Sequence, residues 1–169
     1  MGALRRAAVV AALALPLATA AAPWTVRDAP AGSNALPRAL VTNAAGDELV
    51  LYRDPQSQVL LQFTPGGAFV TLAPKECPSF QIDQRHPVHH FAVDERCHVE
   101  HQRASIQLGQ VQNRQLESNV IDQMMNGGQI AFRFRGADGT YHEAEFPLTR
   151  SAAAIKRALG TSVRVRAAQ

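Results

Sequence analysis

Residues 129–148 read QIAFRFRGADGTYHEAEFPL, and this stretch decides the fold class. In its first half the apolar residues Ile130, Phe132 and Phe134 alternate with polar ones, which is typical of a strand that buries one face. Asp138-Gly139 then tolerates the positive φ angles of a tight reversal, so the second half is expected to return antiparallel to the first. The stretch predicts a β-hairpin.

Short runs of similar character fill most of the chain before this hairpin, with Gly, Pro, Asn and Asp between them. Many short strands with few helices are typical of antiparallel sandwiches and barrels, and parallel α/β architecture is disfavoured because no helices alternate with the early runs. Trp24 is expected to fill the core beside the first strand, and 54–57 to be a hairpin turn. We expect strands at residues 24–26, 38–42, 48–52, 58–63, 68–72, 80–83 and within 99–108. The predicted fold is mainly β: an antiparallel β-sandwich or barrel-like domain with one or two short helices toward the C-terminus.

Two segments near the C-terminus are predicted to be those helices. Ser118 is a candidate N-cap for a short helix that Gly127-Gly128 would end. Either Thr149 or Ser151 is expected to cap a second helix that runs to Gly160. The apolar residues of the second helix share one face, so we expect it to dock on the β core.

The first 22 residues carry the features of a secretory signal peptide. Arg5 and Arg6 supply a positive start, residues 7–15 form an apolar run, and the alanines of 18–22 fit two A-x-A cleavage sites. The apolar run is shorter than the roughly 20 residues that a membrane-spanning helix needs, and no later segment is long and apolar enough, so we expect no transmembrane segment in the mature protein. The expected organisation is a signal peptide at 1–22, a single β-rich domain at 23–162 and a basic C-terminal tail at 163–169. The mature protein is expected to be periplasmic or secreted, in a bacterium.

The net charge of the mature chain is expected to be close to zero. The full chain has 17 Lys and Arg against 14 Asp and Glu, but Arg5 and Arg6 belong to the expected signal peptide, which leaves 15 against 14. A domain with so little net charge has no large field to attract nucleic acid. We therefore expect no nucleic-acid partner, and instead an unidentified protein or cell-envelope partner.

The two cysteines, Cys77 and Cys97, predict a disulfide. An even pair of cysteines in an exported chain is usually oxidised. The bond would close a loop of about 20 residues, which in the chain-entropy model stabilises the fold by about 3 kcal/mol.

Between these cysteines and just beyond lies a segment dense in histidine. Imidazole is a common ligand of zinc, copper and nickel, so the density suggests a metal site. The spacing opposes one: there is no H-E-x-x-H, and in a strand over 97–101 His98 and Glu100 would point one way and His101 the other. Structural or incidental histidines and a pH-sensitive cluster are the alternatives. The candidate ligands are His86, His89, His90, His98 and His101.

Enzymatic motifs are missing from the sequence. It contains neither a G-x-S-x-G nucleophile elbow nor an S-x-x-K motif, and its Gly-Gly pairs do not fit phosphate loops. We expect no catalytic residues and no cofactor. The alternative to having no cofactor is a bound transition metal such as zinc or copper. A hydrolase assembled from residues on separate strands is a further alternative.

Several features of the chain form one pattern: Trp24-Thr25-Val26, two mid-chain cysteines, M-N-G-G at 125–128, I-A-F-R-F at 130–134, Y-x-E-x-x-F-P-L at 141–148 and S-x-A-A-I-x-x-A-L at 151–159. This pattern resembles the bacterial invasion-associated locus B family of exported proteins. The resemblance implies a periplasmic or secreted β-sandwich-like domain, and some members of that family are linked to host-cell invasion. It supplies no catalytic residue, and this chain departs from the pattern in having no cysteine near its early Trp. The resemblance is strongest over residues 118–160.

These expectations lead to one functional hypothesis and one alternative. The hypothesis is an exported, non-enzymatic, β-rich binding or interaction domain. The alternative is a periplasmic metal-binding protein that uses the histidine-rich segment 86–101.

Overall fold

The computed structural model describes residues 22–33, 35–67, 70–89 and 96–168. The expected signal peptide therefore lies outside the described residues, apart from Ala22 at its end. Neither of the two helices in the described part of the chain is long and apolar enough to cross a membrane.

The largest sheet has six strands, each antiparallel to its neighbours. Its strands, in spatial order, are β1 (Thr25–Arg27), β2 (Arg38–Thr42), β3 (Glu48–Arg53), β4 (Gln58–Thr64), β7 (Arg103–Gln110) and β6 (Cys97–Glu100). A smaller antiparallel sheet contains β10 (Tyr141–Pro147), β9 (Gln129–Arg135) and β5 (Ser79–Ile82). The remaining elements are the parallel pair β11 (Arg164–Arg166) and β8 (Gln115–Glu117) and the helices α1 (Asn119–Asn126) and α2 (Ser151–Leu159).

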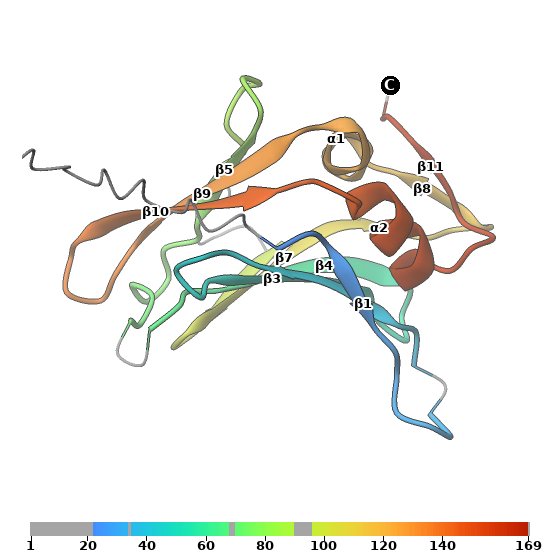
Figure 1. Cartoon of the computed structure of the whole chain (residues 1–169), viewed down its shortest axis with the longest axis horizontal. Coiled ribbons are helices and arrows are strands. Elements are labelled where there is room, and N and C mark those ends of the chain that lie inside the picture. Colours follow the sequence, from blue (N-terminus) through green and yellow to red (C-terminus); the bar gives the residue numbers. More distant parts are fainter. Residues whose placement is uncertain (1–21, 34, 68–69, 90–95, 169) are drawn as a thin grey trace, which may run out of the picture.

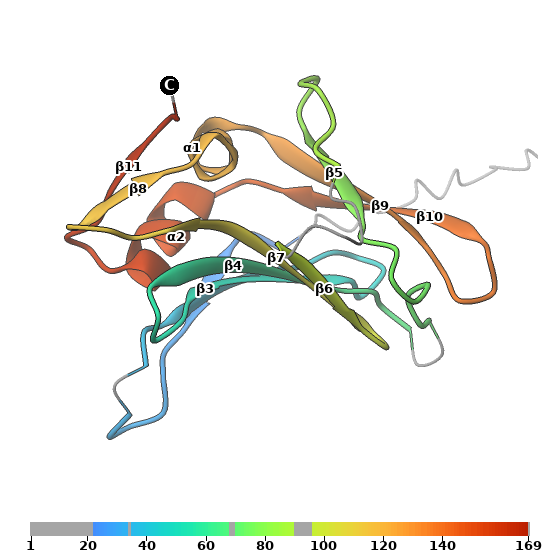
Figure 2. The same ribbon diagram turned by 180° about the vertical axis from the view of Figure 1, so that it is seen from behind.

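The two antiparallel sheets form separate layers around one aromatic core (Figures 1 and 2). Phe63 of β4 lies 5.0 Å between ring centroids from both Phe132 and Phe134 of β9, and 6.3 Å from Phe146 of β10. Ile130, Phe132 and Phe146 are fully buried. The alternation that predicted the hairpin therefore places the aromatic rings of β9 and β10 on the inner face of the small sheet. The predicted mainly β, sandwich-like fold is confirmed.

The N-cap prediction is confirmed for the first helix and wrong for the second. Ser118 accepts a hydrogen bond from the N–H of Ile121 at 3.3 Å and so caps α1. The residue at the start of α2 is Arg150, which has a left-handed backbone (φ 64°) and forms no side-chain cap. Ser151 instead donates to the carbonyl of Met124 at 2.7 Å, because its buried hydroxyl faces α1.

Three other segments differ from the sequence-based expectation. In the expected strand at 68–72, residues 70 and 71 belong to no strand, Leu72 forms an isolated bridge with Gly136, and 68–69 lie outside the described residues. The run at 99–108 is divided between two strands, because the chain reverses at His101. The expected basic tail is not free, because β11 pairs with β8, although both of its arginines are exposed.

Candidate functional site

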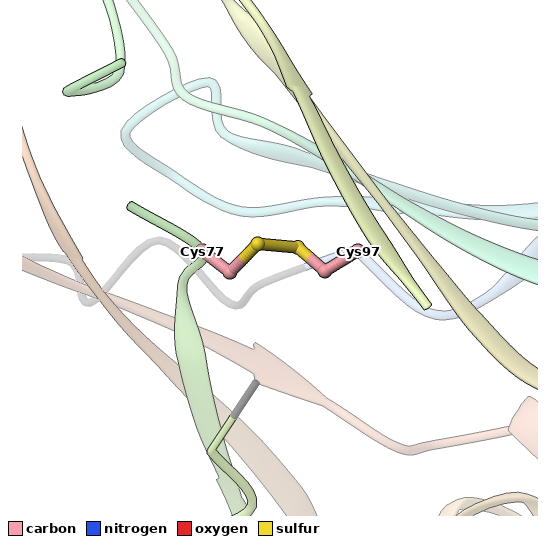
Figure 3. The surroundings of a disulfide bond; sticks show 2 residues. All are labelled: Cys77 and Cys97. Atoms are coloured by element: carbon pink, nitrogen blue, oxygen red, sulfur yellow. A yellow bond between two sulfur atoms is a disulfide. The ribbon is translucent and has the colours of Figure 1, made fainter. Parts of the chain in front are cut away.

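The predicted disulfide between Cys77 and Cys97 is present. The bond joins the segment before β5 to the first residue of β6, with 6.3 Å between the Cα atoms (Figure 3). Because β5 belongs to the small sheet and β6 to the edge of the large one, the bond connects the two layers covalently. It also fixes both ends of the segment that contains His86, His89 and His90, three of the six histidines.

The first part of the histidine-rich segment follows β5. Val88 pairs with Phe80 through two backbone hydrogen bonds of 2.7 and 3.1 Å, which holds the chain against the small sheet. His86 and His89, on either side of Val88, are exposed. His90 lies outside the described residues.

The second part of the segment is β6, where the predicted alternation is confirmed for residues 97–100, whereas the expected strand ends before His101. Cys97 and Val99 face inward, whereas His98 and Glu100 are exposed and lie 3.2 Å apart between Nε2 and Oε1. His101 is in the turn after β6, with a φ of 39°, and lines a shallow hollow of about 490 Å³ beside Glu100. Over the ranges that the structure describes, no group of three or more potential ligands is arranged to hold a metal ion. The metal site stays a prediction; of the candidate histidines that the structure describes, His98 lies within 3.2 Å of a carboxylate oxygen, that of Glu100.

The sixth histidine, His142, belongs to the β9–β10 hairpin. Its ring stacks on Phe134 with 5.1 Å between centroids, and it lines a hollow of about 140 Å³ with Asp138. The N–H and hydroxyl of Thr140 donate to the Asp138 carboxylate at 2.9 and 3.0 Å. These donors, and secondarily the nearby His142, lower the pKa of Asp138. The arrangement stabilises the turn that Asp138-Gly139 predicted.

A further concave site lies on the face of the large sheet that points away from the small sheet. In the register of β2 and β3, Ala39 is opposite Leu51, and both are fully buried against the core. Side chains alternate along a strand, so Arg38 and Tyr52 lie on the opposite, outer face. There the guanidinium carbon of Arg38 sits 4.8 Å from the centroid of the Tyr52 ring.

The neighbouring strand adds a second arginine to this face. Arg27 of β1 is paired directly with Arg38 of β2, so the two side chains project from the same face. Arg27, Arg38 and Tyr52 therefore form a row across three strands. We call this group the arginine row.

Two connections turn this end of the sheet into a pocket. The described part of the β1–β2 connection (28–33 and 35–37) leaves the large sheet on the side away from the small one (Figure 1). The β3–β4 hairpin forms the other wall, and Asp54 closes its turn by accepting the Gln58 N–H at 2.8 Å. The pocket between them has a volume of about 580 Å³, within the range of small-molecule sites. Its lining residues are Ala35, Leu36, Arg38, Tyr52, Arg53, Asp54, Pro55 and Ser57.

Sequence reasoning did not find this pocket. Arg38 and Tyr52 are far apart in the chain, and only the pairing of β2 with β3 makes them neighbours. The usable signals were the predicted strands at 38–42 and 48–52 and the predicted turn at 54–57, because a hairpin places the ends of adjacent strands side by side. Comparisons with protein-family models, with curated proteins and with solved structures find no match to this chain.

Proposed function

We propose that this chain is an exported, non-enzymatic binding domain that acts in the periplasm or outside the cell, similar to the invasion-associated locus B proteins. The observation that carries the proposal is the pocket on the outer face of the large sheet. It combines the guanidinium group of Arg38 and the aromatic ring of Tyr52 with apolar walls, which is the composition of a binding site.

The chemistry of the pocket supports binding over catalysis. Among the described residues that line the pocket, Ser57 is the only one with an aliphatic hydroxyl group. None of these residues is a histidine, lysine or cysteine. A serine needs an adjacent base to become a nucleophile. Asp54, the one carboxylate of the lining, is engaged by the Gln58 N–H in the hairpin turn.

The compartment is supported by two independent features of the chain. The first 22 residues have the three parts of a signal peptide. The Cys77–Cys97 disulfide fits an oxidising compartment.

The export part of the proposal is tested by expressing the full chain in a Gram-negative bacterium and separating the periplasm from the cytoplasm. We expect a periplasmic product whose new N-terminus follows Ala20 or Ala22. The variant Leu13→Asp interrupts the apolar run and is expected to leave an uncleaved cytoplasmic chain with two free thiols. A wild-type chain that stays uncleaved in the cytoplasm would refute export.

The non-enzymatic part is tested with the processed protein on generic ester, peptide and glycoside substrates. We expect no turnover above a heat-denatured control. Turnover that is lost when His98 or His101 is replaced by Ala would overturn this part and favour a hydrolase assembled around the histidine-rich segment.

A further inference from the structure

The arginine row places two positive charges side by side without a compensating acid. Like charges directly opposite each other in a strand pair are unfavourable. Within the described ranges, neither Arg27 nor Arg38 forms an ion pair with a carboxylate. Among the described residues, three arginine–carboxylate pairs do form, and one of them joins Arg157 to Asp28, the residue that follows Arg27.

The pocket beside the row takes its positive charge from Arg38. Arg53 also borders the pocket, but it is paired with the buried Val59, so its side chain projects from the inner face, where its Nη1 lies beside Gly160 after α2. The single acid of the lining, Asp54, has one oxygen committed to the Gln58 N–H. On the outer face, the guanidinium groups of Arg38 and of its neighbour Arg27 therefore stand against one partly occupied carboxylate.

The remaining lining is apolar or aromatic. Ala35 and Leu36 come from the β1–β2 connection, and Pro55 comes from the facing hairpin. The ring of Tyr52 supports the guanidinium of Arg38 from one side, at 4.8 Å. A guanidinium held against a ring keeps its N–H donors in the plane that suits a carboxylate or a phosphate.

From this arrangement we propose that the pocket binds a small amphipathic anion, with a carboxylate or phosphate on an apolar body. The acidic group lies against Arg38, with Arg27 adding long-range attraction, and the apolar body lies against Leu36 and Pro55. This inference rests on the proposed binding function and names its ligand class. The ligand is a free small molecule, because the pocket volume of about 580 Å³ suits a molecule of that size.

The test is isothermal titration calorimetry of the processed protein with octanoate, and with 1-octanol as the uncharged control. We expect saturable binding of octanoate at millimolar concentration or below, and much weaker binding of 1-octanol. Inorganic phosphate is expected to compete only at higher concentration, because it lacks the apolar body. Equal binding of octanoate and 1-octanol, or no binding of octanoate, would overturn the proposal.

Variants place the binding in the pocket. Arg38→Gln removes the charge-assisted hydrogen bonds and is expected to weaken octanoate binding roughly tenfold or more. Arg38→Lys keeps the positive charge but loses the paired N–H donors of the guanidinium, so we expect an intermediate loss of octanoate affinity. Arg85→Gln is the matched control, since Arg85 is exposed in the turn after β5, and it should bind as the wild type does. Thermal melts establish that each variant is folded, and equal losses in Arg38→Gln and Arg85→Gln would refute the assignment.

The arginine row could instead be matched by an anionic membrane surface. Sedimentation with phosphatidylglycerol vesicles, compared with phosphatidylcholine vesicles, distinguishes membrane binding from small-molecule binding. Vesicle binding that depends on Arg38 in a protein that does not bind octanoate would replace the small-molecule proposal. If neither octanoate nor vesicles bind, the export and turnover results that test the proposed function are unaffected. The two proposals can therefore be refuted separately.

Discussion

The indole N–H of Trp24 donates a hydrogen bond to the carbonyl of Pro147 at 2.9 Å, across 123 positions of the sequence. The Trp24 backbone N–H also donates, to Thr149 at 3.1 Å. The residue just before the first strand of the large sheet is thus bonded to the end of β10 in the small sheet. Because the Trp24 side chain is only 3% exposed, the bond is shielded from water.

Replacing Trp24 by Phe is expected to destabilise the protein by about 1–3 kcal/mol, since it removes the donor and part of the packed volume. Urea unfolding of the two proteins measures the difference. Tyr141→Phe is the control, because Tyr141 is 79% exposed and its change should fall within about 0.5 kcal/mol. Equal unfolding midpoints for the Trp24 variant and the wild type would contradict the role of this bond.

Loss of the disulfide is expected to cost about 3 kcal/mol. In the Cys77→Ala, Cys97→Ala double variant the unfolded chain regains the freedom of a loop with a sequence separation of 20 residues. Chemical denaturation measures the loss. A reductant should lower the wild-type midpoint toward that of the double variant and leave the double variant unchanged. A wild type with two titratable thiols before reduction would disprove the bond.

Gly66 is expected to tolerate no side chain. A Cβ at this position would clash with the carbonyl of Ala45 and lie 2.7 Å from the backbone nitrogen of Asp47. The close approach also lets the Gly66 N–H donate to the Asp47 carboxylate at 2.6 Å. Gly66→Ala should therefore destabilise by roughly 1–3 kcal/mol in denaturant unfolding.

Gly128→Ala is the control for this substitution. The nearest atom to a Cβ at Gly128, Asp83 Oδ1, is 3.4 Å away, an ordinary contact distance. A Gly128 variant that lost as much stability as the Gly66 variant would show that the cost is not the clash.

Asp138→Asn is expected to destabilise the protein at neutral pH and to matter less in acid. The Thr140 donors lower the pKa of Asp138 below its ordinary value in the folded state. A carboxyl whose folded pKa is depressed stabilises the fold above its unfolded pKa, and this contribution is lost as the pH falls through the folded pKa. Thermal melts of both proteins across the acid range should converge at low pH, and a constant difference would contradict the linkage.

The sequence predicted those elements whose cause is local. Ile130, Phe132 and Phe134 alternate with polar residues within a single strand. Ser118 caps the helix that follows it by accepting a hydrogen bond from Ile121, only three residues along the chain. The disulfide followed from having a single pair of cysteines in an expected exported chain.

The elements that the sequence did not predict depend on distant partners. Ser151 faces Met124 rather than capping its own helix, because α1 packs beside it. The strand at Arg164–Arg166 is three residues long and forms only by pairing with Gln115–Glu117. The pocket likewise depends on registers between strands that no local pattern specifies.

The histidine-rich segment gives the last prediction, which separates the binding domain from the metal-binding alternative. The pair of His98 and Glu100 supplies two ligands, with side chains 73% and 63% exposed, whereas structural zinc sites use four. We expect micromolar zinc or copper to leave the melting temperature of the untagged, processed protein unchanged. A rise in melting temperature that disappears in His98→Ala but persists in His142→Ala would instead establish a metal site in this segment, because metal that binds only the folded state must stabilise it.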